Sequence, residues 1–145
     1  MADTKSSHST PASLSPAALQ AARPLSPHLQ VYAWSWTMAM SIAHRVTGAA
    51  LYFGTLILAA WLIALICGPV VYDQFKAVAT SIFGRFVLFG YTWALMHHML
   101  GGLRHFIWDV GAGYSDVMRR GLAIAGLIGS VCLTAAIWVV AYSLR

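Results

Sequence analysis

Cysteine and charged residues are both scarce in this chain. Cys67 and Cys132 are the only cysteines among 145 residues, and both lie in apolar stretches without Cys-x-x-Cys spacing. This pattern indicates neither a disulfide framework nor a zinc site. Charged residues make up 9% of the chain, hydrophobic residues 59%, and the mean hydropathy is +0.70. Such a composition is typical of an integral membrane protein and argues against a water-soluble domain.

The chain also lacks clusters of basic residues. Nine basic residues outnumber four acidic ones, for a net charge of +5, but they occur singly or in pairs. Nucleic-acid-binding surfaces gather basic residues on one face, so we expect no nucleic-acid partner. No internal repeat is visible, and we expect a single helical bundle.

The first 22 residues contain no apolar run of signal-peptide length. They are rich in Ser, Ala, Thr and Pro, which predicts a flexible tail over residues 1–22. A transit peptide is the alternative, which Asp3 and the absence of arginine before Arg23 disfavour. Pro24 and Pro27 then keep the chain extended, as in a docking segment or an ordinary linker.

The remainder, residues 23–145, predicts an all-α membrane domain with three transmembrane helices. No charge occurs from Val46 to Tyr72. We predict spans at about 37–67, 81–109 and 121–144, each longer than the roughly 20 residues that a crossing needs. Asp73 to Lys76 should lie outside the membrane, and the residues after Asp109 should form a turn.

The distribution of basic residues predicts the orientation of these spans. Three crossings place the N-terminus and the loop after Asp109 on one side, with the loop around Lys76 and the C-terminus on the other. Six of the nine basic residues fall on the first side, which the positive-inside rule makes cytoplasmic. We therefore expect a multi-pass protein with a cytoplasmic N-terminus, in a bacterial inner membrane in preference to a mitochondrial one. The six residues are Lys5, Arg23, Arg45, Arg104, Arg119 and Arg120.

The second predicted span carries three histidines and an arginine at membrane depth. Helical periodicity places His98, His105 and Asp109 on one face, together with the small residues Ala94 and Gly101/Gly102. Imidazole is a good ligand for iron, and small residues let a flat cofactor such as haem b lie close to a helix. The alternative is that the histidines only bond to neighbouring helices, but ionisable groups in membranes are costly and usually functional.

The first predicted span carries Ser41, His44 and Arg45 near its start. Ser41 and Arg45 are one turn apart and share a face with Gly48, whereas His44 points to the side. Ser41 and Arg45 would form a hydrogen-bonding pocket for a carbonyl, and Arg45 together with His44 would offer cations for carboxylates. The alternative for Arg45 is that its side chain only snorkels to the membrane surface.

The predicted topology places both polar segments in one leaflet. Trp34 and Trp36 should mark the membrane interface, because amphipathic rings suit the headgroup level. His98 should lie roughly 16 Å below Asp109, whereas His44 and Arg45 should lie only about 6 to 13 Å below these tryptophans. Haem b suits this arrangement, with its iron at the deep His98. Its two propionates would then rise toward His44, Arg45 and His105.

Three motifs in this order resemble the cytochrome b membrane-anchor subunit of succinate dehydrogenase, respiratory complex II. They are Arg-Pro-Leu-Ser-Pro-His-Leu at residues 23–29, Ser-Ile-x-His-Arg-x-Thr-Gly at 41–48 and His-x-x-x-Gly-x-Arg-His-x-x-x-Asp at 98–109. The resemblance covers residues 23–145. It implies that His98, rather than His97, is the axial haem ligand. It further implies that Ser41 and Arg45 help bind ubiquinone and that His44 approaches a haem propionate.

The chain holds no flavin motif and no cysteine pattern for iron–sulfur clusters. Succinate oxidation therefore belongs to partner chains, and this chain would have no catalytic residue of its own. The resemblance implies a flavoprotein carrying FAD, an iron–sulfur subunit, and a second anchor subunit that completes the bundle and supplies the other haem ligand. Together with them, this chain would form part of the ubiquinone-reduction site of the respiratory chain and tricarboxylic acid cycle.

Two alternatives use the same residues differently. One is a haem-free structural anchor of this or a fumarate-reducing complex, in which His98 only packs. The other is a small transporter subunit that uses the buried cations as an ion path. A transporter should carry polar residues along more than one span, yet the span at 121–144 is almost wholly apolar.

Overall fold

The computed structural model describes residues 15–23 and 33–144, which fall into two separate units, Met1–Ala33 and Trp34–Arg145. The described part of the first unit contains the short helix α1, Pro16–Ala21. Ser15 caps it, because its hydroxyl accepts the N–H of Ala18 at 3.2 Å. The predicted tail over residues 1–22 thus includes one helix that the sequence did not predict. Residues 1–14 and the predicted docking segment at 24–32 lie outside the described residues.

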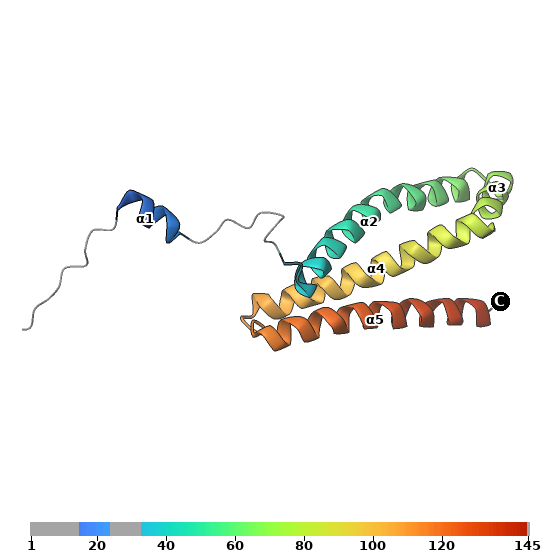
Figure 1. The fold of residues 1–145 in the computed structure, drawn as a ribbon. Coiled ribbons are helices and arrows are strands. Elements are labelled where there is room, and N and C mark those ends of the chain that lie inside the picture. The colour runs from blue at the N-terminus through green and yellow to red at the C-terminus, as the bar shows by residue number, and fades with distance from the viewer. Residues whose placement is uncertain (1–14, 24–32, 145) are drawn as a thin grey trace, which may run out of the picture. The chain divides into compact units, whose positions relative to one another are not determined.

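The second unit consists of helices connected by short turns (Figure 1). Its described residues contain no strand, which confirms the all-α prediction. The central helix is α4, which packs against α2 on one side and α5 on the other. The four helices are α2 (Trp36–Ile66), α3 (Pro69–Thr80), α4 (Ile82–Asp109) and α5 (Asp116–Ser143).

Two of these helices are individually long and apolar enough to cross a membrane, namely α2 and α5. The pair α3 and α4 meets the same test only together, with a bend of 77° between them. Arg85, Arg104 and Asp109 lower the hydropathy of α4. At about 1.5 Å per residue, its 28 residues still exceed the roughly 30 Å of a hydrocarbon core. The described residues therefore provide two spans, or three when α3 and α4 count as one.

The short helix α3 occupies the segment that we expected to be a simple connection. Gly68 adopts a φ of +96°, which ends the preceding helical region, and Pro69 then starts α3 with its preset φ. Ser81 separates α3 from α4 and caps α4 by accepting the N–H of Gly84 at 3.1 Å. The prediction of a loop around Asp73 was therefore wrong, because local signals for a helix start directly follow the break.

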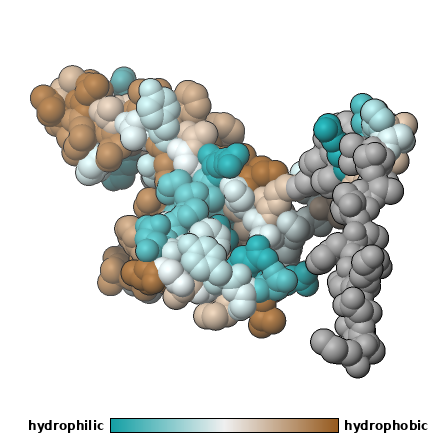
Figure 2. Space-filling view, turned by 90° about the vertical axis from the view of Figure 1, so that its left-hand side faces the viewer, coloured by the Kyte–Doolittle hydropathy of each residue, from teal (hydrophilic) through white to brown (hydrophobic). Residues whose placement is uncertain are grey.

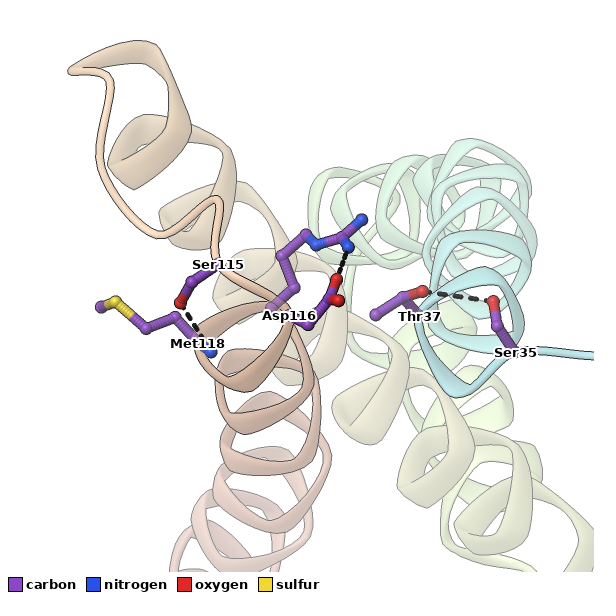
Figure 3. A network of polar contacts seen from close by, with 6 residues as sticks. Ser35, Thr37, Ser115, Asp116 and Met118 are labelled. Atoms are coloured by element: carbon purple, nitrogen blue, oxygen red, sulfur yellow. Dashed lines mark hydrogen bonds and ion pairs between the residues drawn. The ribbon is translucent and has the colours of Figure 1, made fainter.

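Serine caps also start α2 and α5. Ser35 accepts the N–H of Met38 at 3.3 Å. Ser115 accepts the N–H of Met118, also at 3.3 Å (Figure 3). Asp116 follows in the first turn of α5 and pairs with Arg119 (Figure 3). Between α4 and α5, Gly111 and Gly113 both have φ near +80°, which confirms the predicted turn. From the end that holds this turn, hydrophilic residues gather in the middle of the bundle, with hydrophobic ones around them (Figure 2).

The interior of the unit is narrow and partly polar. Its fully buried apolar residues are mostly alanines, and large apolar side chains point outward, as expected where lipid is the solvent. Ala123 is the buried alanine of α5. A Cβ on Gly129 would lie 3.0 Å from Leu100 of α4, whereas one on Gly126 would meet nothing within 4 Å.

Candidate haem and quinone site

The rings of His44 and His98 stack where α2 crosses α4. Their centroids are 4.0 Å apart and their planes differ by 11°. His44 Nε2 donates to the carbonyl of His98 at 3.2 Å, and His98 Nδ1 donates to the carbonyl of His44 at 3.1 Å. Each carbonyl can only accept, so a ring N–H must be the donor in both bonds. The two predicted polar segments therefore meet and join the two helices.

The stacked rings lie at one level along the bundle, which corrects our expectation that His44 lies above His98. The two depths were counted from different reference points, Asp109 at the end of α4 and Trp34 and Trp36 around the start of α2. Counting residues along a helix ignores the tilt of one helix relative to another, so it could not fix the relative height.

Glycines on the opposite helices make room for each ring. A Cβ on Gly101 of α4 would clash with the ring of His44, and a Cβ on Gly48 of α2 would lie 2.9 Å from His98 Cε1. A Cβ on Gly102 would meet nothing within 4 Å. Gly101 and Gly102 were both predicted to let a flat cofactor lie close to the helix. His44 covers Gly101, so only Gly102 leaves the backbone of α4 open to a ligand.

Gly101→Ala is expected to lower the thermal stability of the purified protein, because its methyl group must displace the His44 ring that holds α2 against α4. Overpacking of this kind costs about 1–3 kcal/mol. Gly90→Ala is the matched control on the same helix, since a Cβ there meets nothing within 4 Å. Equal melting temperatures for the two variants would mean that the His44 contact does not hold the crossing together.

The second ring nitrogen of His98 is the one available to a metal. Because Nδ1 donates to the His44 carbonyl, the neutral ring carries its lone pair on Nε2, which has no hydrogen-bond partner among the described residues. Metal-bound histidines usually donate their other ring N–H to a carbonyl or carboxylate in this way. His98 therefore fits the role of an axial haem ligand in its orientation, tautomer and half-buried position.

His97 faces the other side of α4. Its side chain is 5% exposed, and its Nδ1 lies 3.5 Å from Ser130 Oγ of α5. Its ring stacks on Trp93 with centroids 5.3 Å apart. For His97, the structure thus shows the contact with a neighbouring helix that was the alternative for all three histidines.

His105 extends the histidine cluster toward the α4–α5 turn. Its ring lies edge-on to His44, with centroids 5.4 Å apart, and edge-on to Trp108 at 5.2 Å. We call His44, His98 and His105 the imidazole cluster. Among the described residues, no three His, Cys, Asp or Glu side chains are arranged to hold a bare metal ion. Haem needs only one or two axial ligands, so this arrangement is compatible with haem iron.

Ser41 and Arg45 lie on α2 beside the imidazole cluster. Ser41 is half-buried and Arg45 is exposed. Neither side chain forms a hydrogen bond or ion pair within the described part of the chain. Both donors are therefore free to bind a carbonyl or carboxylate, as the pocket predicted from the sequence requires.

Arg104 was expected to contribute only its charge, yet the structure buries it near the imidazole cluster. Its side chain is 8% exposed and lies over the ring of Trp108, with Cζ 5.1 Å from the ring centroid. Arg104 Nε and Trp108 Nε1 are buried without a hydrogen-bond partner among the described residues. The i, i+4 spacing of arginine and tryptophan is the sequence signal that could have shown this pair.

Positive charge in this region is not balanced by the chain itself. Arg119–Asp116 is the only ion pair that the described residues form, so neither Arg45 nor Arg104 has a carboxylate partner there. A buried or membrane-facing cation without a partner is costly. The site therefore suits a ligand that brings its own carboxylates.

Comparison with known proteins decides the family. Residues 20–141 match a family described as the succinate dehydrogenase/fumarate reductase transmembrane subunit. This chain belongs to that family. The relatives of this transmembrane subunit include the succinate dehydrogenase cytochrome b556 subunit of Paracoccus denitrificans, which is 40% identical over 111 residues, 77% of this chain and 85% of the relative.

Further relatives of the transmembrane subunit come from bacteria and mitochondria. The cytochrome b556 subunit of Rickettsia conorii is 35% identical over 118 residues, covering 81% of this chain and 91% of the relative. The mitochondrial cytochrome b560 subunit of Bos taurus is 37% identical over 121 residues, covering 78% and 70%. The resemblance inferred from three motifs is thereby confirmed, and the chain is a transmembrane subunit.

Proposed function

We propose that this chain is the membrane-anchoring haem b subunit of a succinate:quinone oxidoreductase and forms part of its ubiquinone-reduction site. The observation that carries the proposal is the His98 imidazole, whose Nδ1 is bound to the His44 carbonyl while Nε2 stays free. The names of the relatives, cytochromes b556 and b560, support a haem in this family. The unbalanced cations beside His98 support a ligand with carboxylates.

Haem b fits the residues of this site. His98 would be an axial ligand, because its Nδ1 is bound to the His44 carbonyl and its Nε2 is left free. Gly102 would let the macrocycle approach the backbone of α4, because a Cβ there would meet nothing within 4 Å. His44, Arg45 and His105 would hold the propionates. The Arg45 guanidinium and the His105 ring have N–H groups that suit carboxylates. His44 already donates from Nε2 to the His98 carbonyl, so it would donate to a propionate from Nδ1 in its protonated form. When bound, haem supplies a one-electron carrier within the membrane.

Ser41 and Arg45 would bind the quinone head group. The Ser41 hydroxyl and the Arg45 guanidinium donate hydrogen bonds to a quinone carbonyl oxygen, one helical turn apart on the same face. The positive charge of Arg45 favours the negative charge that this oxygen gains during reduction. Protons for the quinol would come from the cytoplasmic side, on which we place these residues.

A second anchor subunit would supply the other iron ligand. Among the described residues, His97 packs against α5, His44 stacks on His98, and His105 lies two turns along the same helix. None of them can face His98 across a haem plane without rearrangement. The flavoprotein with FAD and the iron–sulfur subunit would oxidise succinate and deliver electrons, with the complex held in a bacterial inner membrane.

Affinity purification of this chain from mild-detergent extracts tests the anchoring role. We expect a flavoprotein, an iron–sulfur protein and a second small hydrophobic protein to co-purify, with succinate-to-quinone activity in the same fraction. Recovery of the chain without the flavoprotein and the iron–sulfur protein would contradict the proposal. Recovery with a complex that reduces fumarate and contains no haem would instead support the structural-anchor alternative.

A further inference from the structure

The two helices that carry the haem and quinone residues diverge at their far ends. They touch at the imidazole cluster, and Tyr91 of α4 packs over Gly54 of α2, where a Cβ would clash with the tyrosine ring. Beyond this contact α2 and α4 separate, and α3 closes the gap between them (Figure 1). The gap contains a cavity of about 540 Å³, lined by all three helices.

The walls of this cavity are almost entirely apolar. Ile57, Leu58 and Trp61 line it from α2, and Leu88 and Leu95 from α4. Ile57 and Leu88 also border a second apolar hollow of about 340 Å³, so the apolar gap continues beside the first cavity. A water molecule would find few hydrogen-bond partners in such a space, whereas a hydrocarbon chain can pack against its walls.

One charged residue borders the cavity, and it lies on α3. Lys76 is exposed and forms no ion pair among the described residues. Because α3 is bent by 77° from α4, it runs nearly along the membrane surface when α4 crosses the bilayer. With α4 across the bilayer, Lys76 would lie near the level of the lipid phosphates, and the apolar gap would lie near the level of the acyl chains.

We propose that an anionic phospholipid binds here, with an acyl chain in the gap between α2 and α4 and its phosphate at Lys76. The volume lies within the roughly 300–1,000 Å³ of small-molecule sites in proteins. The ammonium group of Lys76 provides the charge complementarity that selects an anionic head group. The site is distinct from the imidazole cluster and does not depend on haem or quinone binding.

Lipid exchange on the purified whole complex tests this site. The complex is incubated in mixed micelles with equal amounts of dioleoylphosphatidylglycerol and dioleoylphosphatidylcholine, and retained lipid is quantified by mass spectrometry. We expect phosphatidylglycerol to be retained preferentially, and Lys76→Gln to reduce that preference by about five-fold, the effect of one basic residue near a lipid phosphate. Arg85→Gln is the matched control and should leave the preference unchanged, since Arg85 does not line the gap between α2 and α4 and instead borders a smaller cavity of about 140 Å³ on the α5 side of α4.

A second variant tests the acyl-chain part of the site. Leu58→Trp adds bulk to the wall of the gap and should lower the retention of both lipids. The proposal is overturned if the unmodified complex shows no preference, or if Lys76→Gln and Arg85→Gln change it equally. It is also overturned if lipid extraction of the unmodified complex recovers neither phospholipid. That is the result expected if a partner helix or a quinone tail fills the gap.

Discussion

Replacing His98 with leucine is expected to abolish the low-spin bis-histidine haem spectrum of the purified complex, whereas His97→Leu should retain it. His98 presents a free Nε2 on the α2 side of α4, and His97 is buried against Ser130 and Trp93 on the α5 side. The two variants remove the same group from adjacent positions, so each controls for the other. Optical and electron paramagnetic resonance spectra of the reduced and oxidised complexes provide the measurement.

Loss of haem should also weaken the association of the two anchor subunits. A ligand that binds only the assembled state stabilises that state by mass action, so the thermal stability of the His98→Leu complex should fall together with its haem content. This chain expressed alone should bind little haem for the same reason. A spectrum abolished by His97→Leu and retained by His98→Leu would reverse the assignment of the ligand.

Arg45→Ala is expected to lower succinate-to-quinone activity by about 10²–10³-fold, the usual effect of removing one oriented donor to a developing negative charge. Electron transfer from succinate to an artificial acceptor should stay unchanged, because Arg45 lies in the membrane subunit and not at the succinate site. Comparing the two activities in the same preparation measures the effect. Arg120→Ala is the control, since it removes another exposed cation from the same predicted side of the membrane.

Haem content must be measured in the Arg45→Ala complex, because the same side chain is proposed to bind a propionate. Unchanged quinone kinetics with full haem content would remove Arg45 from the quinone site. Loss of both activities would point to failed assembly and not to the loss of a quinone contact, and co-purification of the flavoprotein distinguishes these cases.

The helical period of the sequence predicted much of this arrangement. His98, His105 and Gly101 were expected on one face of α4, and the structure places all three toward His44 of α2. The membrane class, the helical fold and the family followed from composition and three motifs. Their roles toward haem and quinone remain predictions, because a face shows which residues can act together and not what they bind.

Other features depend on how helices cross, which periodicity does not describe. The stacking of His44 on His98 and the covering of Gly101 instead of Gly102 depend on the angle and offset between α2 and α4. The sequence did not predict α3, because its 12 residues carry mixed polarity. They also lie between two breaks in the chain, one marked by Pro69 and the other by Ser81. The burial of Arg104 depends on packing of α4 against its neighbours, which the charge pattern alone could not predict.

The haem content of the unmodified complex is the most direct test of the proposal that this chain is a haem b subunit. A difference spectrum after reduction by succinate, combined with haem extraction, gives the amount of haem b per copy of this chain. We expect one haem b, coordinated by two histidines, in each complex. A complex that oxidises succinate, contains this chain in full amount and shows no b-type absorbance bands would contradict it.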